Sequence, residues 1–265
     1  MIAGRSNSQR FFGGVGLYAA IAAYVVFALF PIYWTLKISV TPERLLYSEG
    51  ITFWPSHMTL QNFVTVLEAT DFPRYFLNSV IVSVSTAALV TVIATLAGYA
   101  MSRFTFRGKA ALALMLLLTQ TFPLVMVIPP IYRVMGQIGL INSLTGLIII
   151  YTAFNTAFAT FLMQSFFDGI PKDLEEAAMI DGCTRAQAMR KVIVPLTLPG
   201  MGATLGFVFT AAWSELLFAL MLISSDDQKT FAVGLLTFIG KFAVDWGQMM
   251  AASILALIPV CIFFA

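Results

Sequence analysis

Residues 75–102 read YFLNSVIVSVSTAALVTVIATLAGYAMS, a run of 28 uncharged residues between Arg74 and Arg103. About 20 consecutive apolar residues are enough for an α-helix to cross the hydrocarbon core of a bilayer. A stretch of this length without one charged side chain is typical of a transmembrane helix. The run therefore predicts that the chain is embedded in a membrane through residues 76–102.

Charge-free runs recur along the rest of the chain. They hold 26 residues between Arg10 and Lys37, 23 between Lys109 and Arg133, 34 between Arg133 and Asp168, 23 between Lys191 and Glu215, and 20 from Trp246 onward. Together they predict an all-α membrane protein with six transmembrane helices in a single domain, residues 1–265. The expected spans are roughly 14–36, 76–102, 110–132, 144–167, 199–223 and 246–265, with kinks at Pro123, Pro129, Pro130 and Pro259.

The composition agrees with a membrane protein. Of 265 residues, 59% are apolar and 11% are charged, and the mean hydropathy is +0.89. Soluble domains average about 45–50% apolar and about 25% charged residues. The composition excludes a soluble domain, a disordered chain and a collagen-like fibre. A net charge of +2 is too small to indicate binding to nucleic acid.

The inventory of reactive side chains argues against catalysis. His57 is the one histidine, and Cys183 and Cys261 lie far apart without metal-ligand spacing. The chain lacks the phosphate-binding pattern GxxxxGK[ST], because around Gly108 and Lys109 an arginine stands in place of the first glycine and an alanine in place of Ser/Thr. We therefore expect a chain that is not an enzyme and holds no metal or cofactor.

Loop charges predict the orientation of the spans. Cytoplasmic loops carry an excess of Lys and Arg. If both termini are cytoplasmic, nine basic residues lie on that side and six lie outside, which has the expected sign. The nine are Arg5, Arg10, Arg103, Arg107, Lys109, Lys172, Arg185, Arg190 and Lys191.

The cytoplasmic loop 168–195, DGIPKDLEEAAMIDGCTRAQAMRKVIVP, is the most informative segment outside the spans. Pro171 fits the first turn of a helix, and Asp173 with Glu176 resembles a capping box. Gly182 is a natural helix stop, and Thr184 with its glutamine three residues later fits a second capping box. The pattern predicts a short helix, a glycine break and a second short helix.

One face of the first short helix carries little bulk. Leu174, Ala177, Ala178 and Asp181 share it at helical spacing. A small face lets a partner approach closely, so the helix suits a groove on another protein. The open alternative is an ordinary amphipathic helix that links two spans.

The loop resembles the EAA motif of ABC importer permeases, which reads EAA, three residues, G, nine residues, I, one residue, LP. Here Glu176-Ala177-Ala178, Gly182 and Val192 to Pro195 stand at that spacing, with Val192 and Val194 in place of Ile and Leu. Residues 78–80, 100–104 and 106–109 extend the similarity to nearly the whole chain. The sequence looks like the maltose-type carbohydrate permeases, specifically their MalG-like subunit. Members of that group usually carry a short basic tail after the last span. Since this sequence stops at Ala265 without such a tail, we expect it to be truncated there.

That resemblance implies the type I ABC importer permease fold, with loop 168–195 as a cytoplasmic coupling helix. It implies a multi-pass subunit of the bacterial cytoplasmic (inner) membrane that forms half of a pathway for a sugar or oligosaccharide. The expected partners are a second, MalF-like permease, two ATPase subunits that bind ATP and Mg, and an extracytoplasmic solute-binding protein. Glu176, Ala177, Ala178 and Gly182 would be the residues that couple this chain to the ATPase.

Polar side chains inside the spans are candidates for the substrate pathway. A charged residue at the centre of a span costs about 2.5–3.5 kcal/mol on insertion scales, so Glu215 needs a reason to be there. It is either a pathway or gating carboxylate, or a residue near the outer end of the span that snorkels to the interface or pairs within the permease dimer. Gln120 and Asn155 could contact substrate or bond neighbouring helices, and Trp213 could stack on a sugar or pack in the core.

Two other functional classes remain as alternatives. A secondary transporter or channel that works without ATP predicts charged residues in several spans and an inverted repeat, whereas Glu215 stands alone and no repeat is visible. A membrane-embedded enzyme predicts clustered His, Asp or Glu side chains, which the sequence lacks.

Overall fold

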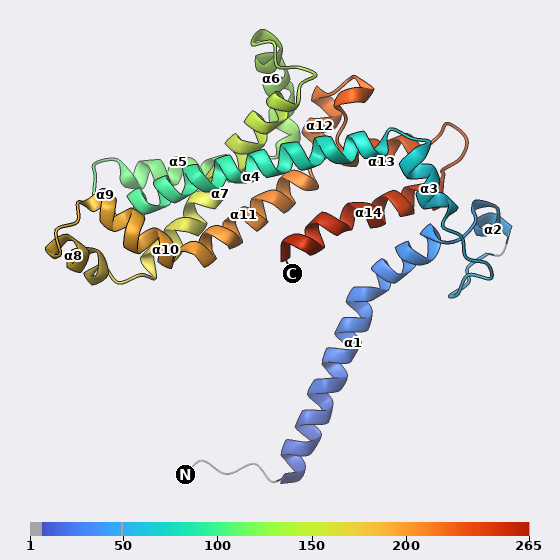
Figure 1. Cartoon of the computed structure of the whole chain (residues 1–265), viewed down its shortest axis with the longest axis horizontal. Helices are drawn as coiled ribbons and strands as arrows, with labels where there is room; N and C mark the ends of the chain where they lie inside the picture. Colours follow the sequence, from blue (N-terminus) through green and yellow to red (C-terminus); the bar gives the residue numbers. More distant parts are fainter. Residues whose placement is uncertain (1–6, 49, 265) are drawn as a thin grey trace. The chain divides into compact units, whose positions relative to one another are not determined.

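The structure is a computed structural model that describes residues 7–48 and 50–264, with side chains described from residue 16. Over these residues its regular secondary structure is helical apart from one isolated bridge between Ile239 and Val244, and turns and irregular segments join the helices. The helices are α1 (Asn7–Ser39), α2 (Glu43–Ser48), α3 (Gln61–Glu68), α4 (Phe72–Arg103), α5 (Lys109–Thr121), α6 (Leu124–Gln137), α7 (Leu144–Asp168), α8 (Asp173–Ile180), α9 (Arg185–Ala188), α10 (Val194–Leu196), α11 (Leu198–Trp213), α12 (Leu217–Leu222), α13 (Phe231–Leu235) and α14 (Trp246–Phe264), with a π-helix at Met189–Ile193 and 3₁₀ turns at Asp226–Gln228 and Leu236–Phe238 (Figure 1).

Four single helices are long and apolar enough to cross a membrane, namely α1, α4, α7 and α14. Two bent pairs raise the total to at most six if each pair counts as one span, so the six spans expected from the sequence are the upper limit, and the second pair begins within the loop 168–195. The pairs are α5 with α6, bent by 101°, and the helical run Arg185–Leu196 with α11, bent by 71°.

Two of the expected spans differ from straight helices. The span expected at 110–132 breaks between α5 and α6, where Phe122 and Pro123 are both extended. A proline lacks the N–H that continues a helix and forces the preceding residue into extended backbone, so this break follows from Pro123. The span expected at 199–223 ends at Trp213, and the chain restarts as α12 after residues 214–216.

The chain divides into two compact units, and each is described by itself. The first contains residues up to Thr70 together with Phe238–Ile258, and the second contains Asp71–Thr237 together with residues from Pro259. That residues 1–265 form one domain stays a prediction.

In the first unit, short polar contacts tie the helices together. The Glu43 carboxylate accepts hydrogen bonds from the backbone N–H groups of Trp246 (3.2 Å) and Gly247 (2.7 Å), the first residues of α14. A carboxylate there satisfies N–H groups that have no partner within the helix. The buried Asn62 amide donates to the backbone carbonyls of Ser39 and Thr41 at 2.9 and 3.0 Å.

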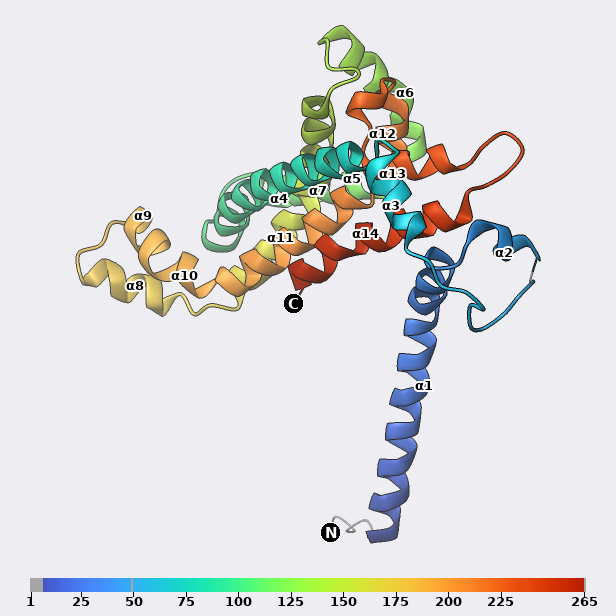
Figure 2. The same cartoon turned by 45° about the vertical axis from the view of Figure 1, so that its right-hand side comes forward.

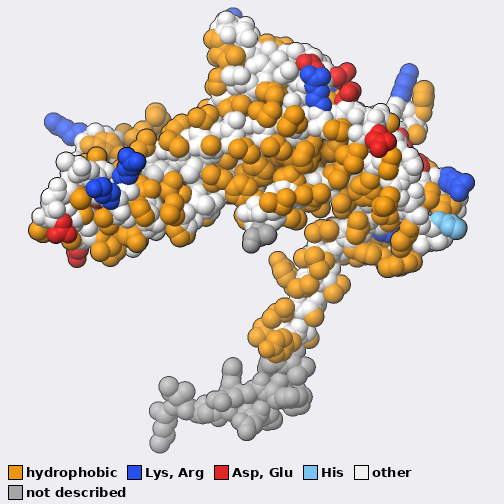
Figure 3. All heavy atoms as spheres, in the orientation of Figure 1, with side chains coloured by type: hydrophobic (Ala, Val, Ile, Leu, Met, Phe, Trp, Pro, Cys, Tyr) orange, Lys and Arg blue, Asp and Glu red, His pale blue; other side chains and the backbone are white. Residues whose placement is uncertain are grey.

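In the second unit, α4 packs along α7 and α11, and the three helices lie side by side (Figure 1 and Figure 2). Figure 3 shows hydrophobic side chains spread over α4 and α11, whereas charged side chains gather at both ends of this unit, around α8 and α9 and again beside α12. A continuous apolar surface between charged ends is typical of a membrane-embedded bundle, so the second unit fits a bilayer.

The contact between α4 and α7 depends on a glycine. A Cβ atom at Gly98 would lie 2.8 Å from the Met163 Cβ and 2.8 Å from the Gln164 backbone nitrogen. Gly98→Ala should therefore lower the free energy of unfolding by about 1–3 kcal/mol through overpacking. Gly202→Ala in α11 is the matched control, because nothing lies within 4 Å of its Cβ position and a helical Gly→Ala change stabilises by roughly 0.5–1 kcal/mol. Thermal unfolding in detergent measures both, and equal stabilities for the two variants would contradict the close packing.

Candidate functional site

The loop 168–195 folds as the sequence predicts in its main features. α8 is followed by Gly182, whose φ of +87° lies in the left-handed region that favours glycine. The Cys183 N–H donates to the Ala178 carbonyl at 3.0 Å and the Gly182 N–H donates to the Met179 carbonyl at 3.1 Å. This pair of bonds is a Schellman motif, and it confirms that Gly182 ends the first short helix.

The second predicted capping box is present and the first is not. The Gln187 N–H donates to Thr184 Oγ1 (3.3 Å), and the Thr184 N–H donates to Gln187 Oε1 (2.8 Å), at the start of α9. The capping box expected from Asp173 and Glu176 is wrong, because the N-cap residue is Lys172 and no side chain caps this end. Asp173 instead lies in the first turn, where its charge favours the helix dipole.

The predicted coupling residues divide between a buried and an exposed side of α8. Glu176 and Ala177 are exposed, and so is Gly182, whereas Ala178 is 8% exposed and faces the loop's own interior. The surface of α8 that is free to meet a partner therefore differs from the expected small face. It is formed by Leu174, Ala177 and Ile180, of which Ile180 is 87% exposed.

A carboxylate that the sequence did not single out joins α8 to α4. The Glu175 side chain is 5% exposed, and its Oε1 accepts a hydrogen bond from the Tyr99 hydroxyl at 2.5 Å. Its Oε2 lies 3.3 Å from Nε of Arg103, whose side chain is 4% exposed, and its Oε1 lies 3.9 Å from Nε of Arg185. Glu175 precedes Ala178 by three residues, so helical spacing places both on the buried side.

Arg103 and its neighbour also hold the start of the loop. The Arg103 Nη2 donates to the Ile170 carbonyl at 2.9 Å, and the Ser102 hydroxyl donates to Asp168 Oδ1 at 2.6 Å. A cavity of about 240 Å³, lined mainly by charged side chains, opens beside these contacts. Its lining residues are Arg103, Lys172, Glu175, Glu176, Met179 and Arg185.

A second cavity, the polar cavity, brings together three of the four predicted pathway residues. Gln120, Asn155 and Glu215 all line a space of about 280 Å³ within the second unit. The structure does not bring Trp213 there, because its buried ring packs against Phe76 (5.4 Å between centroids) and Phe231 (4.7 Å).

Glu215 has a defined structural position in the break between α11 and α12. Its Oε1 accepts from the Leu217 and Phe218 N–H groups at 2.8 and 3.1 Å, so the carboxylate caps the start of α12. Its Oε2 accepts from the hydroxyl of the buried Tyr151 at 2.6 Å. The carboxylate thus bridges α7 and α12 at the wall of the cavity.

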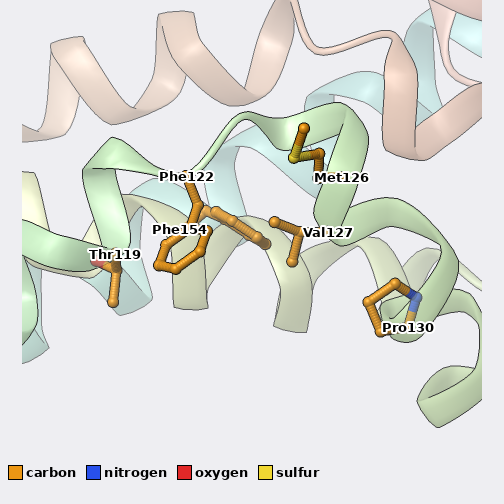
Figure 4. A pocket seen from close by; sticks show the side chains of 6 residues that line it. All are labelled: Thr119, Phe122, Met126, Val127, Pro130 and Phe154. Atoms are coloured by element: carbon orange, nitrogen blue, oxygen red, sulfur yellow. The ribbon is translucent and has the colours of Figure 1, made fainter.

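An apolar cavity of about 500 Å³ adjoins this one at the bend between α5 and α6 (Figure 4). It shares Thr119, Phe122 and Phe154 with the polar cavity. The sequence predicts a kink at Pro123 but not the 101° bend at which this cavity lies.

Residues 91–265 match the family of binding-protein-dependent transport system inner membrane components. The chain belongs to this family. It is a multi-pass inner membrane permease of a binding-protein-dependent ABC transporter, in which ATP hydrolysis is carried by a partner subunit. The predictions of a permease family and of a non-catalytic transport subunit are confirmed.

Relatives within this family match nearly the full length of the chain. The sulfoquinovosyl glycerol transport system permease SmoH of Agrobacterium fabrum is 37% identical over 96% of this chain and 90% of its own length. The diacetylchitobiose uptake permease DasC of Streptomyces coelicolor is 35% identical over 92% and 89%. The trehalose/maltose permease MalG of Thermococcus litoralis is 33% identical over 89% and 86%.

Solved structures share the fold. A chain of a bacterial ABC transporter involved in alginate import superposes with a TM-score of 0.83 at 23% identity, covering 99% of this chain and 97% of that chain. A chain of the alginate transporter in complex with an alginate-bound periplasmic protein gives a TM-score of 0.67 at 16% identity, covering 97% and 92%. The prediction of an ABC importer permease fold is confirmed.

Proposed function

We propose that this permease forms half of the translocation pathway for a sugar or oligosaccharide. The similar permeases of Agrobacterium, Streptomyces and Thermococcus are named for glycosides, disaccharides and related carbohydrates, which supports a carbohydrate substrate. Its assembly would contain a second permease subunit, two ATPase subunits and the solute-binding protein. Both termini would lie in the cytoplasm, because that orientation puts more Lys and Arg residues on the cytoplasmic side. One of these residues, Arg5, lies outside the described residues.

Coupling to the ATPase is assigned to Glu176, Ala177, Ala178 and Gly182. The observation that supports this role best is the exposed apolar side of α8, with Leu174 and Ile180 on either side of Ala177, among charged side chains. An apolar surface on a short helix in a polar loop suits a groove on a partner. Within this set, Ala178 would support α8 from its buried side, and Gly182 would end the helix.

The substrate pathway is assigned to the polar cavity. Glu215, Gln120 and Asn155 supply one carboxylate and two carboxamides, which can accept and donate hydrogen bonds to sugar hydroxyls. Trp213, two residues before Glu215 in the chain, would act on the pathway only indirectly, because its ring packs against Phe76 and Phe231.

Reconstituted transport tests the proposal. The complete assembly is reconstituted in proteoliposomes with its binding protein loaded with a candidate sugar. The proteoliposomes should accumulate that sugar when ATP is supplied on the side of the membrane that carries the ATPase subunits, and should not accumulate it without ATP. Equal uptake with and without ATP would favour an ATP-independent transporter instead. A panel of mono- and oligosaccharides and non-sugar solutes would identify the substrate class. Uptake confined to non-sugar solutes would contradict a carbohydrate substrate.

A further inference from the structure

The tie between α8 and α4 is made by side chains. In its backbone packing α8 contacts chiefly α9 and the π-helix that follow it in the same loop. The Glu175 carboxylate crosses to α4 through the Tyr99 hydroxyl and the Arg103 guanidinium. Force applied to α8 therefore has a direct route into α4 through these contacts, besides the covalent route along the loop.

We propose that Glu175 is a positioning residue that holds α8 rigidly on the cytoplasmic end of α4, so that movement of α8 is passed to the membrane bundle. The inference rests on the proposed docking of α8 on the ATPase and adds the element that receives the movement. Because α4 packs along α7 and α11, displacement of its end is transmitted to the core of the second unit.

The neighbouring glutamates differ in what they contact. Glu176 is exposed and free to meet a partner, whereas Glu175 is buried and has three partners within this chain. Burying an ion pair seldom stabilises a fold more than apolar side chains of similar volume would. An ion pair and a short hydrogen bond do restrict direction and register, which a transmitting contact requires and an apolar contact does not supply.

The end of α4 is also fixed to the start of the loop. Arg103 holds the Ile170 carbonyl, and Ser102 holds Asp168. The Tyr99 ring packs edge-on against Phe104 and Phe167, with centroids 5.9 and 5.6 Å apart. With these contacts in place, the Glu175 carboxylate is the point at which α8 itself joins a rigid cluster.

The test measures transport and ATP hydrolysis on the same proteoliposomes that hold the complete assembly. Glu175→Leu should leave ATPase copurification intact and hydrolysis within twofold of the wild type, while sugar uptake falls at least tenfold. Glu175→Gln, which still accepts from Tyr99, should give an intermediate ratio of sugar transported to ATP hydrolysed. Glu68→Leu, an exposed glutamate in α3, is the matched control and should leave the ratio unchanged.

A merely structural role predicts a different result. Uptake and hydrolysis would then fall in proportion to the amount of folded complex, and that result, or unchanged uptake in Glu175→Leu, overturns the proposal. If Glu175→Leu lowers the yield of complex, the ratio of sugar transported to ATP hydrolysed is measured in Tyr99→Phe instead, because this variant removes one hydroxyl and no charge. Failure of α8 docking itself is distinguishable, since Ala177→Trp would then leave ATPase copurification unchanged.

Discussion

Ala177→Trp is expected to abolish ATP-dependent uptake while the protein still inserts and folds. Ala177 is exposed on α8 beside Leu174, so the indole meets no obstacle within the chain itself. In a packed interface an added bulky side chain costs about 1–3 kcal/mol or more, and each 1.4 kcal/mol weakens binding about tenfold. We expect ATPase copurification to fall at least tenfold and uptake to fall with it.

Ala110→Trp is the control for this substitution. Ala110 is an exposed alanine at the start of α5, outside loop 168–195. Its replacement should leave both copurification and uptake within twofold of the wild type. Equal losses in the two variants, or normal uptake in Ala177→Trp, would contradict a role of the exposed side of α8.

Glu215→Ala is expected to be the most destabilising change at the polar cavity. Glu215 precedes the N-cap residue Leu216 and caps α12 through its side chain; losing such a side-chain cap costs about 0.5–2 kcal/mol, and a buried hydroxyl left without a partner costs about 1–3 kcal/mol. Because the carboxylate caps α12 and accepts from Tyr151, the free energy of unfolding should fall by about 2–4 kcal/mol. Thermal unfolding in detergent, followed by circular dichroism, measures the loss.

Tyr151→Phe separates the two parts of this effect. It removes the hydroxyl and leaves the cap of α12 in place, so its cost should be about 1 kcal/mol. The double variant should then be less destabilised than the sum of the single ones, because both lose the same hydrogen bond. Strict additivity, or a stable Glu215→Ala variant, would show that the carboxylate does not bridge the two helices.

The spans and the break in loop 168–195 were predictable because they follow from local chemistry. A charge-free run of 28 residues has few alternatives to a transmembrane helix. Gly182 and the capping box at Thr184 involve residues at most five positions apart, so their geometry can be deduced from spacing alone. The family resemblance rested on the same residues.

The contacts between segments distant in sequence were not predictable in the same way. Glu175 and Glu176 are identical side chains on one short helix, and their different burial depends on Tyr99 and Arg103, some seventy residues earlier. The sequence likewise predicts a kink at Pro123 but not the angle of that kink, which depends on how α6 packs in the folded chain. Tertiary packing, which spacing does not encode, decided both.

Photocrosslinking from α8 tests most directly whether a cytoplasmic ATPase drives this permease through loop 168–195. Benzoylphenylalanine at Ile180, which is 87% exposed, should form its main adduct with the ATPase subunit in the assembled transporter. The same residue at Ile51, equally exposed but in the segment expected outside, should form none with it. An Ile180 probe that labels only lipid or solvent, with no ATPase adduct in the intact complex, would contradict the proposed coupling.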